Sequence, residues 1–169
     1  MRLRLLAVAM LGAACSSAMN TPCTMTWTGG AMGTADCTGA ASDELLALQT
    51  NASSLNWLVS KADSQYQASF QYQVPNPPAD SYSGGTTDTQ FCIASLIGVT
   101  GTSNPGFFAR SRENTSTGSP AVGSCGITFT SKTDTSSSST KRFTVHGTAT
   151  ATLISAADAG VTSTLTVTF

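Results

Sequence analysis

The sequence predicts an all-β protein, an antiparallel β-sandwich of Ig-like or jelly-roll-like type with roughly eight strands and two disulfides. Three observations support this prediction. Threonine, a β-branched residue that suits pleated strands, occurs 27 times in 169 residues. Apolar and polar residues alternate with period two in several segments, as in strands with one buried face. Short turn signals separate these segments at the spacing of a sandwich.

The strand segments follow one another along the chain. Residues 55–59 (LNWLV) form a short apolar strand, whereas 43–48 (DELLAL) fits either one helical turn or a strand. Residues 66–74 alternate apolar side chains with glutamine and serine, which predicts a half-buried strand. Residues 91–99 (FCIASLIGV) are nearly all apolar, which predicts a central strand buried on both faces. Further alternating strands are expected at 125–130, 143–153 and 164–169, with threonine on their polar faces.

The N-terminus has the features of an export signal. Arg2 and Arg4 precede the ten-residue apolar stretch 5–14, which is too short to span a bilayer, and Cys15 follows it. The segment 12–15 (GAAC) resembles the lipobox of bacterial lipoproteins. That resemblance implies that residues 1–14 are a signal peptide and that Cys15 is lipidated. It also implies, from Ser16, sorting to the outer membrane. The alternative is ordinary cleavage after residues 16–18 (SSA), which would give a secreted chain.

Four cysteines remain once Cys15 is set aside, and four cysteines allow three disulfide connectivities. Cys23 and Cys37 flank Gly29-Gly30, which is a hairpin turn signal. We therefore predict the pairs Cys23–Cys37 and Cys92–Cys125. No CxxC pair is present, which argues against a zinc site. The expected organisation is a signal peptide (1–14), a lipidated cysteine with a short tether (15–22) and one sandwich domain (23–169).

Composition argues against several function classes. The formal net charge is −1, which disfavours binding to nucleic acid. His146 is the only histidine, and its strand parity places it on a threonine face. The sequence therefore offers only one candidate general base for a His-assisted hydrolase. The nine carboxylates mostly adjoin turn residues, where aspartate caps its own backbone. Calcium held by loop oxygens near Asp80 and Asp88 is a weaker alternative without a recognised motif. We expect no catalytic residues, metal or cofactor.

Aromatic residues are the best candidates for ligand binding. Trp27 and Trp57 share parity with apolar neighbours, so they are expected in the core. Tyr82 lies between two serines and is expected to be exposed in a loop. Phe107 and Phe108 are adjacent, so on a strand they point to opposite faces and one of them is expected to be exposed. Residues 110–113 (RSRE) read as a solvated strand edge.

These observations predict a non-catalytic binding or structural domain anchored to the cell envelope by its N-terminal lipid. Its partner would be an envelope protein or a polysaccharide. The alternatives are a carbohydrate-binding module, which needs exposed aromatic side chains, and a small secreted hydrolase, which needs convergent carboxylates or His146.

Overall fold

The computed structural model describes residues 22–38, 43–47, 49, 51–99, 103–113 and 118–169, so the signal segment and Cys15 lie outside the described residues. The described residues form eleven strands and no helix. In chain order these are β1 (Thr24–Gly29), β2 (Gly33–Asp36), β3 (Glu44–Ala47), β4 (Ser54–Ala62), β5 (Tyr66–Pro75), β6 (Ser81–Ser83), β7 (Phe91–Gly98), β8 (Phe107–Arg110), β9 (Ser124–Asp134), β10 (Lys141–Ser155) and β11 (Thr162–Thr168).

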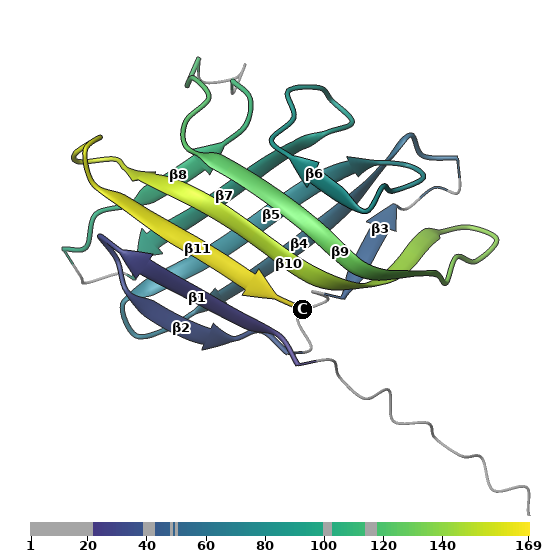
Figure 1. Ribbon diagram of the computed structural model, residues 1–169, viewed down its shortest axis with the longest axis horizontal. Helices are drawn as coiled ribbons and strands as arrows, with labels where there is room; N and C mark the ends of the chain where they lie inside the picture. Colours follow the sequence, from purple (N-terminus) through teal and green to yellow (C-terminus); the bar gives the residue numbers. More distant parts are fainter. Residues whose placement is uncertain (1–21, 39–42, 48, 50, 100–102, 114–117) are drawn as a thin grey trace, which may run out of the picture.

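The strands form two layers that run across one another (Figure 1). The front layer has the order β2-β1-β11-β10-β9-β6, and the back layer has the order β3-β4-β5-β7-β8. The long strand β10 belongs to both, because its first residues pair with β3 and its last two pair with β8. Every pairing between strands is antiparallel. The predicted antiparallel sandwich is therefore confirmed.

The core lies between the layers and follows the period-two alternation of the sequence. In β5 the residues of one parity, from Tyr66 to Val74, are buried, and the intervening glutamines and serine face outward. Trp57 of β4 packs against the C-terminal Phe169 with ring centroids 4.7 Å apart, which joins the two layers. Burial of such large side chains contributes about 2–3 kcal/mol each. Trp27 and Trp57 are thus core residues, as their parity predicts.

Both predicted disulfides are present. Cys23 and Cys37 are joined beside the β1–β2 hairpin, where the Cys37 amide also donates to the Cys23 carbonyl over 2.9 Å. Cys92 in β7 is joined to Cys125 in β9, so this bond connects the back layer to the front layer. A shift of β7 or β9 by one residue would have turned its cysteine sulfur away from the core and toward solvent.

Two expectations about strands need correction, and one open alternative is decided. The described residues form eleven strands rather than about eight, because short segments such as β6 and β8 pair with longer neighbours. The ambiguous segment 43–48 contains the strand β3. The strand β7 is not buried on both faces, because Ile93 and Ile97 are 45% and 49% exposed on the outer face of the back layer. An apolar run alone does not show which face another layer covers.

A glycine allows the irregular pairing of β9 with β10. The register shifts between His146 and Gly147, which is a β-bulge or similar irregularity. A Cβ atom at Gly147 would collide with the carbonyl oxygen of Thr128 on the neighbouring strand. The close approach of the two backbones therefore requires glycine at this position.

The described residues include no helix with the length and hydropathy needed to cross a bilayer.

Candidate functional site

The outer face of the back layer carries one cross-strand row of side chains that mixes apolar, amide and cationic groups. Strand register places Leu58 opposite Gln71, Gln71 opposite Ile93, and Ile93 opposite Arg110. Leu58 and Ile93 are about half exposed, at 54% and 45%. No strand covers this face in the fold of the described residues, so the row is open to a ligand.

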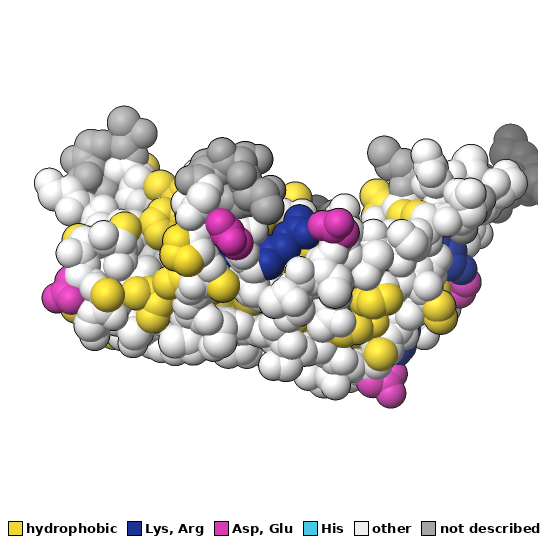
Figure 2. Space-filling view, turned by 90° about the horizontal axis from the view of Figure 1, so that it is seen from above, with side chains coloured by type: hydrophobic (Ala, Val, Ile, Leu, Met, Phe, Trp, Pro, Cys, Tyr) yellow, Lys and Arg dark blue, Asp and Glu magenta, His cyan; other side chains and the backbone are white. Residues whose placement is uncertain are grey.

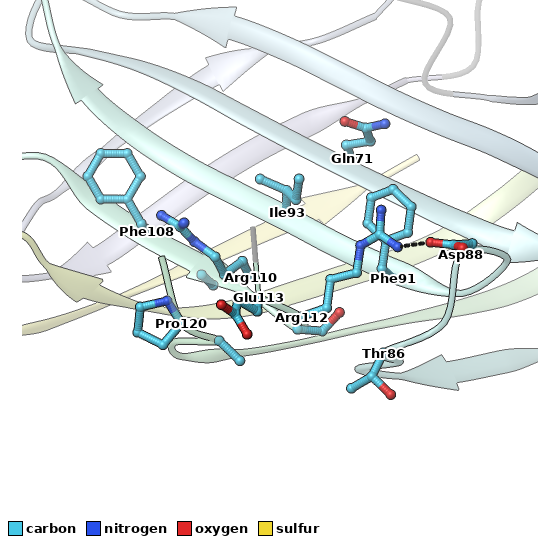
Figure 3. Close-up of a pocket in the computed structure, with 13 residues that line it drawn as sticks. Gln71, Thr86, Asp88, Phe91, Ile93, Phe108, Arg110, Arg112, Glu113 and Pro120 are labelled. Atoms are coloured by element: carbon cyan, nitrogen blue, oxygen red, sulfur yellow. Dashed lines mark hydrogen bonds and ion pairs between the residues drawn. The ribbon is translucent and has the colours of Figure 1, made fainter. Parts of the chain in front are cut away.

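A groove with a volume of about 890 Å³ lies at the β7–β8 end of this row. Its floor comes from the outward residues of β7 and β8, and its walls come from the segments after β6 and after β8 (Figure 3). The residues that line it include Gln71, Asp88, Phe91, Ile93, Phe108, Arg110, Arg112 and the exposed Glu113. A volume of this size suits a ligand of several rings rather than a single ion.

Arg112 is held firmly at one end of the groove. Its guanidinium carbon lies 3.9 Å from the centroid of the Phe91 ring, and its Nη1 lies 2.5 Å from Asp88 Oδ1. The preceding residue, Ser111, accepts a hydrogen bond from the Cys92 amide over 2.9 Å and donates to the Gly85 carbonyl oxygen. The charge of Arg112 is therefore already paired, and the side chain acts mainly as a wall.

Arg110 is different, because its guanidinium has no hydrogen-bond or ion-pair partner among the described residues. Its backbone is fixed by two hydrogen bonds with Val122, of 2.7 and 3.0 Å. In Figure 3 its side chain extends toward the Phe108 ring, with Ile93 beside it. Such a guanidinium can bind a carboxylate through two parallel hydrogen bonds. The apolar part of the same ligand can pack on the neighbouring aromatic ring.

Side-chain amides border the groove along β5. Gln73 donates to the Asp88 carbonyl oxygen over 2.6 Å and to the Ser54 hydroxyl over 2.7 Å. Both hydrogen atoms of its amide nitrogen are therefore engaged within the protein. Gln71 makes one long contact of 3.4 Å with Asn56 and lines the groove. Its amide can therefore donate to and accept from a ligand hydroxyl.

The three aromatic candidates have different positions. Phe107 is fully buried, whereas Phe108 points to the outer face, lines the groove and is half-buried. The two rings therefore face opposite sides as expected, but neither of them is fully exposed. Tyr82 is not in an exposed loop. It lies in β6 and is half-buried, because β6 pairs with β9 and brings its ring to within 6.2 Å of Tyr72. Its hydroxyl accepts a hydrogen bond from the Ala79 amide over 2.6 Å.

His146 lies on β10 in the front layer, and the groove lies on the back layer. Its side chain is half-buried rather than exposed, and Nδ1 is buried without a hydrogen-bond partner. The groove therefore contains no imidazole. A hydrolytic mechanism based on His146 would need a different site from the groove.

The two loop carboxylates considered for calcium are each engaged by a cation. Asp80 lies 2.5 Å from Lys132 Nζ, and this hydrogen bond and charge hold the pKa of Asp80 below its ordinary value. Asp88 pairs with Arg112. Among the described residues, no group of three or more histidine, cysteine, aspartate or glutamate side chains could hold a metal ion.

Sequence reasoning missed the groove because it assigned residues 110–113 to a solvated edge. In the structure Arg110 and Arg112 are half-buried, and the groove contacts both. The odd Phe107-Phe108 pair was the signal that pointed to this surface.

Searches of the chain against protein-family models, curated proteins and solved structures found no match.

Proposed function

We propose that this chain is a non-catalytic binding protein of the cell envelope, held at the outer membrane by lipid on Cys15. The observation that supports a binding role is the Arg110 guanidinium in the groove beside Phe108 and Ile93, which has no ion-pair or hydrogen-bond partner among the described residues. The support for anchoring is the lipobox-like segment 12–15. Three acyl chains on one cysteine exceed the two signals that stable membrane anchoring requires.

Anchoring is tested by the intact mass of the protein from the membrane fraction. The expected mass corresponds to residues 15–169 with three acyl chains. A Cys15→Ala variant should lack these chains and leave the membrane fraction. A mass that begins near Met19, found in the medium, would instead identify a secreted protein and refute the anchor.

The groove favours an acidic carbohydrate as its ligand. This proposal takes up the carbohydrate-binding alternative and adds that the sugar must carry a negative charge. Arg110 would pair with the carboxylate, Gln71 would bond hydroxyl groups, and Phe108 would pack on the apolar face of a sugar ring.

Binding is tested with polygalacturonate, with neutral dextran as the uncharged comparison. We expect Arg110→Gln to weaken binding to polygalacturonate by about 10- to 100-fold, since hydrogen bonds to charged groups contribute about 1.5–3 kcal/mol. Arg142→Gln is the matched control, because Arg142 lies on β10 and its guanidinium is 3.5 Å from Glu44. Equal effects of the two variants would show only a general charge effect. No binding by the wild type would refute the acidic-sugar proposal.

A further inference from the structure

A second surface, independent of the groove, lies on the front layer. Three neighbouring strands, β1, β11 and β10, carry threonine at each of three successive outward positions. Register places these threonines opposite one another in three rows of three. The rows are Thr24–Thr168–Thr148, Thr26–Thr166–Thr150 and Thr28–Thr164–Thr152, and we call these nine residues the threonine grid.

The grid is regular and open. β1 and β11 pair without a register shift over six residue pairs, and β10 and β11 do so over seven. Eight of the nine threonines are exposed, and the central Thr166 is half-buried. Strand geometry sets the repeat at about 4.7–4.9 Å between strands and about 6.6–6.8 Å along each strand. The three strands lie side by side in Figure 1.

The composition of the grid differs from that of the other outer face. β4 and β5 in the back layer contain no threonine and place serine, asparagine, glutamine and the apolar Leu58 outward. General strand propensity would favour threonine on both faces equally. Threonine at all nine grid positions is therefore specific to the front layer.

Within the part of the chain that the structure describes, none of the nine grid hydroxyl groups has a hydrogen-bond partner. Ser60, Ser69 and Ser95 on the back layer, in contrast, all form hydrogen bonds. Each free hydroxyl can donate one hydrogen bond and accept two. Each adjacent methyl group restricts the orientation of the water around it.

The chemistry of the grid disfavours most ligand classes. It has no cation for a phosphate or carboxylate and no aromatic ring on which a sugar could stack. It also lacks the large aromatic and arginine side chains that dominate protein interfaces. The front face appears along the lower margin of Figure 2, where the outline is even and most side chains are neither hydrophobic nor charged.

We propose that the threonine grid binds ice. Hydroxyl and methyl groups that repeat in two dimensions can order a layer of water, and spacings of this size are comparable to the oxygen repeats in planes of hexagonal ice. The ordered layer would then freeze to the crystal and attach the protein to it. The proposal does not depend on the groove or on the lipid anchor.

The test follows fluorescently labelled full-length protein while a single ice crystal grows slowly through the solution. We expect the wild type to be incorporated into the ice and to inhibit recrystallisation. Thr166→Lys places a charged chain at the centre of the grid and should abolish both effects. Gln67→Lys is the matched control, since Gln67 is exposed on β5 of the back layer, and it should behave as the wild type.

Two results would overturn the proposal. One is exclusion of the wild type from the crystal, and the other is equal incorporation of the wild type and Thr166→Lys. Circular dichroism of each variant checks that it is folded. Should Thr166→Lys not fold, Thr26→Lys at the margin of the grid replaces it, with the same expected loss.

Discussion

Cys92 in β7 and Cys125 in β9 form a disulfide that crosses from the back layer to the front layer, with their Cα atoms 6.5 Å apart. The second disulfide, Cys23–Cys37, closes one hairpin within the front layer. The first separates its cysteines by 33 residues and the second by 14. The two bonds therefore constrain the unfolded chain to different degrees.

Removing the disulfide between the layers should cost more stability than removing the hairpin disulfide. The chain-entropy model gives about 4 kcal/mol for the longer loop and about 3 kcal/mol for the shorter one. The measurement is denaturant unfolding of two double-alanine variants, one for each cysteine pair. A larger loss for the Cys23–Cys37 variant would contradict this expectation.

Gly147→Ala should be among the most damaging single substitutions. The new Cβ would collide with the Thr128 backbone, which cannot move away without breaking strand pairing, so we expect a loss of about 3 kcal/mol or more. Gly160→Ala is the control, since its Cβ would meet only a carboxylate oxygen of Asp158 at 3.3 Å. Thermal unfolding compares the two, and equal melting temperatures would disprove the role of Gly147.

The protein should lose stability in alkali through Tyr72. Burial first, and then the nearby Tyr82, raise the pKa of Tyr72 to about 12 from 10.0. The neutral phenol is therefore favoured in the folded state. Its contribution is fully present below pH 10 and is lost as the pH rises toward 12.

A Tyr72→Phe variant checks this sign. It loses the 2.6 Å hydrogen bond to the Gly84 carbonyl and should be less stable by about 1 kcal/mol at neutral pH. Above pH 10 the gap between variant and wild type should narrow, because phenylalanine cannot ionise. Denaturant unfolding across this pH range measures it, and a gap that stays constant or widens would refute the argument.

The β9–β10 hairpin should respond to acid through Asp134. Hydrogen bonds from Lys141 and then Ser136 lower the pKa of Asp134 to about 2 from 3.8. A depressed pKa means that the hairpin contacts are stabilising above about pH 4 and are lost as the pH falls through 2.

The measurement for the hairpin is the NMR shift of the Ser136 amide, which lies 2.9 Å from Asp134 Oδ1, as a function of pH. We expect a midpoint near 2 in the wild type and no such transition in Asp134→Asn. A midpoint at the ordinary value of 3.8 would show that the Lys141 and Ser136 contacts do not persist in solution.

The sequence predicted the burial of individual side chains well where the pattern was local. Trp27 and Trp57 were expected in the core from parity alone, and both are buried. The side of a strand on which a residue lies depends only on whether its position is odd or even. The pair Cys23–Cys37 was predicted from one turn signal, and Cys92–Cys125 was the pair that remained.

The candidate site could not be found in that way. Gln71, Ile93 and Arg110 are aligned only because β5, β7 and β8 are neighbours with a given register. The exposure of Ile93 on β7 depends on the absence of a covering strand, which is a property of the whole sandwich. A local apolar run therefore misled the prediction for that strand.

The sequence by itself determined the strand class and the facing of residues in the alternating strands, and it favoured the disulfide pairing that the structure shows, because alternation and turn chemistry act between near neighbours. Only the tertiary structure decided which strands adjoin. Thr24 pairs with Thr168, which is distant in the sequence, and no local pattern specifies that pair. Both the groove and the threonine grid arise from such long-range pairing, because the register of strands distant in the chain is set by the packing of the whole core.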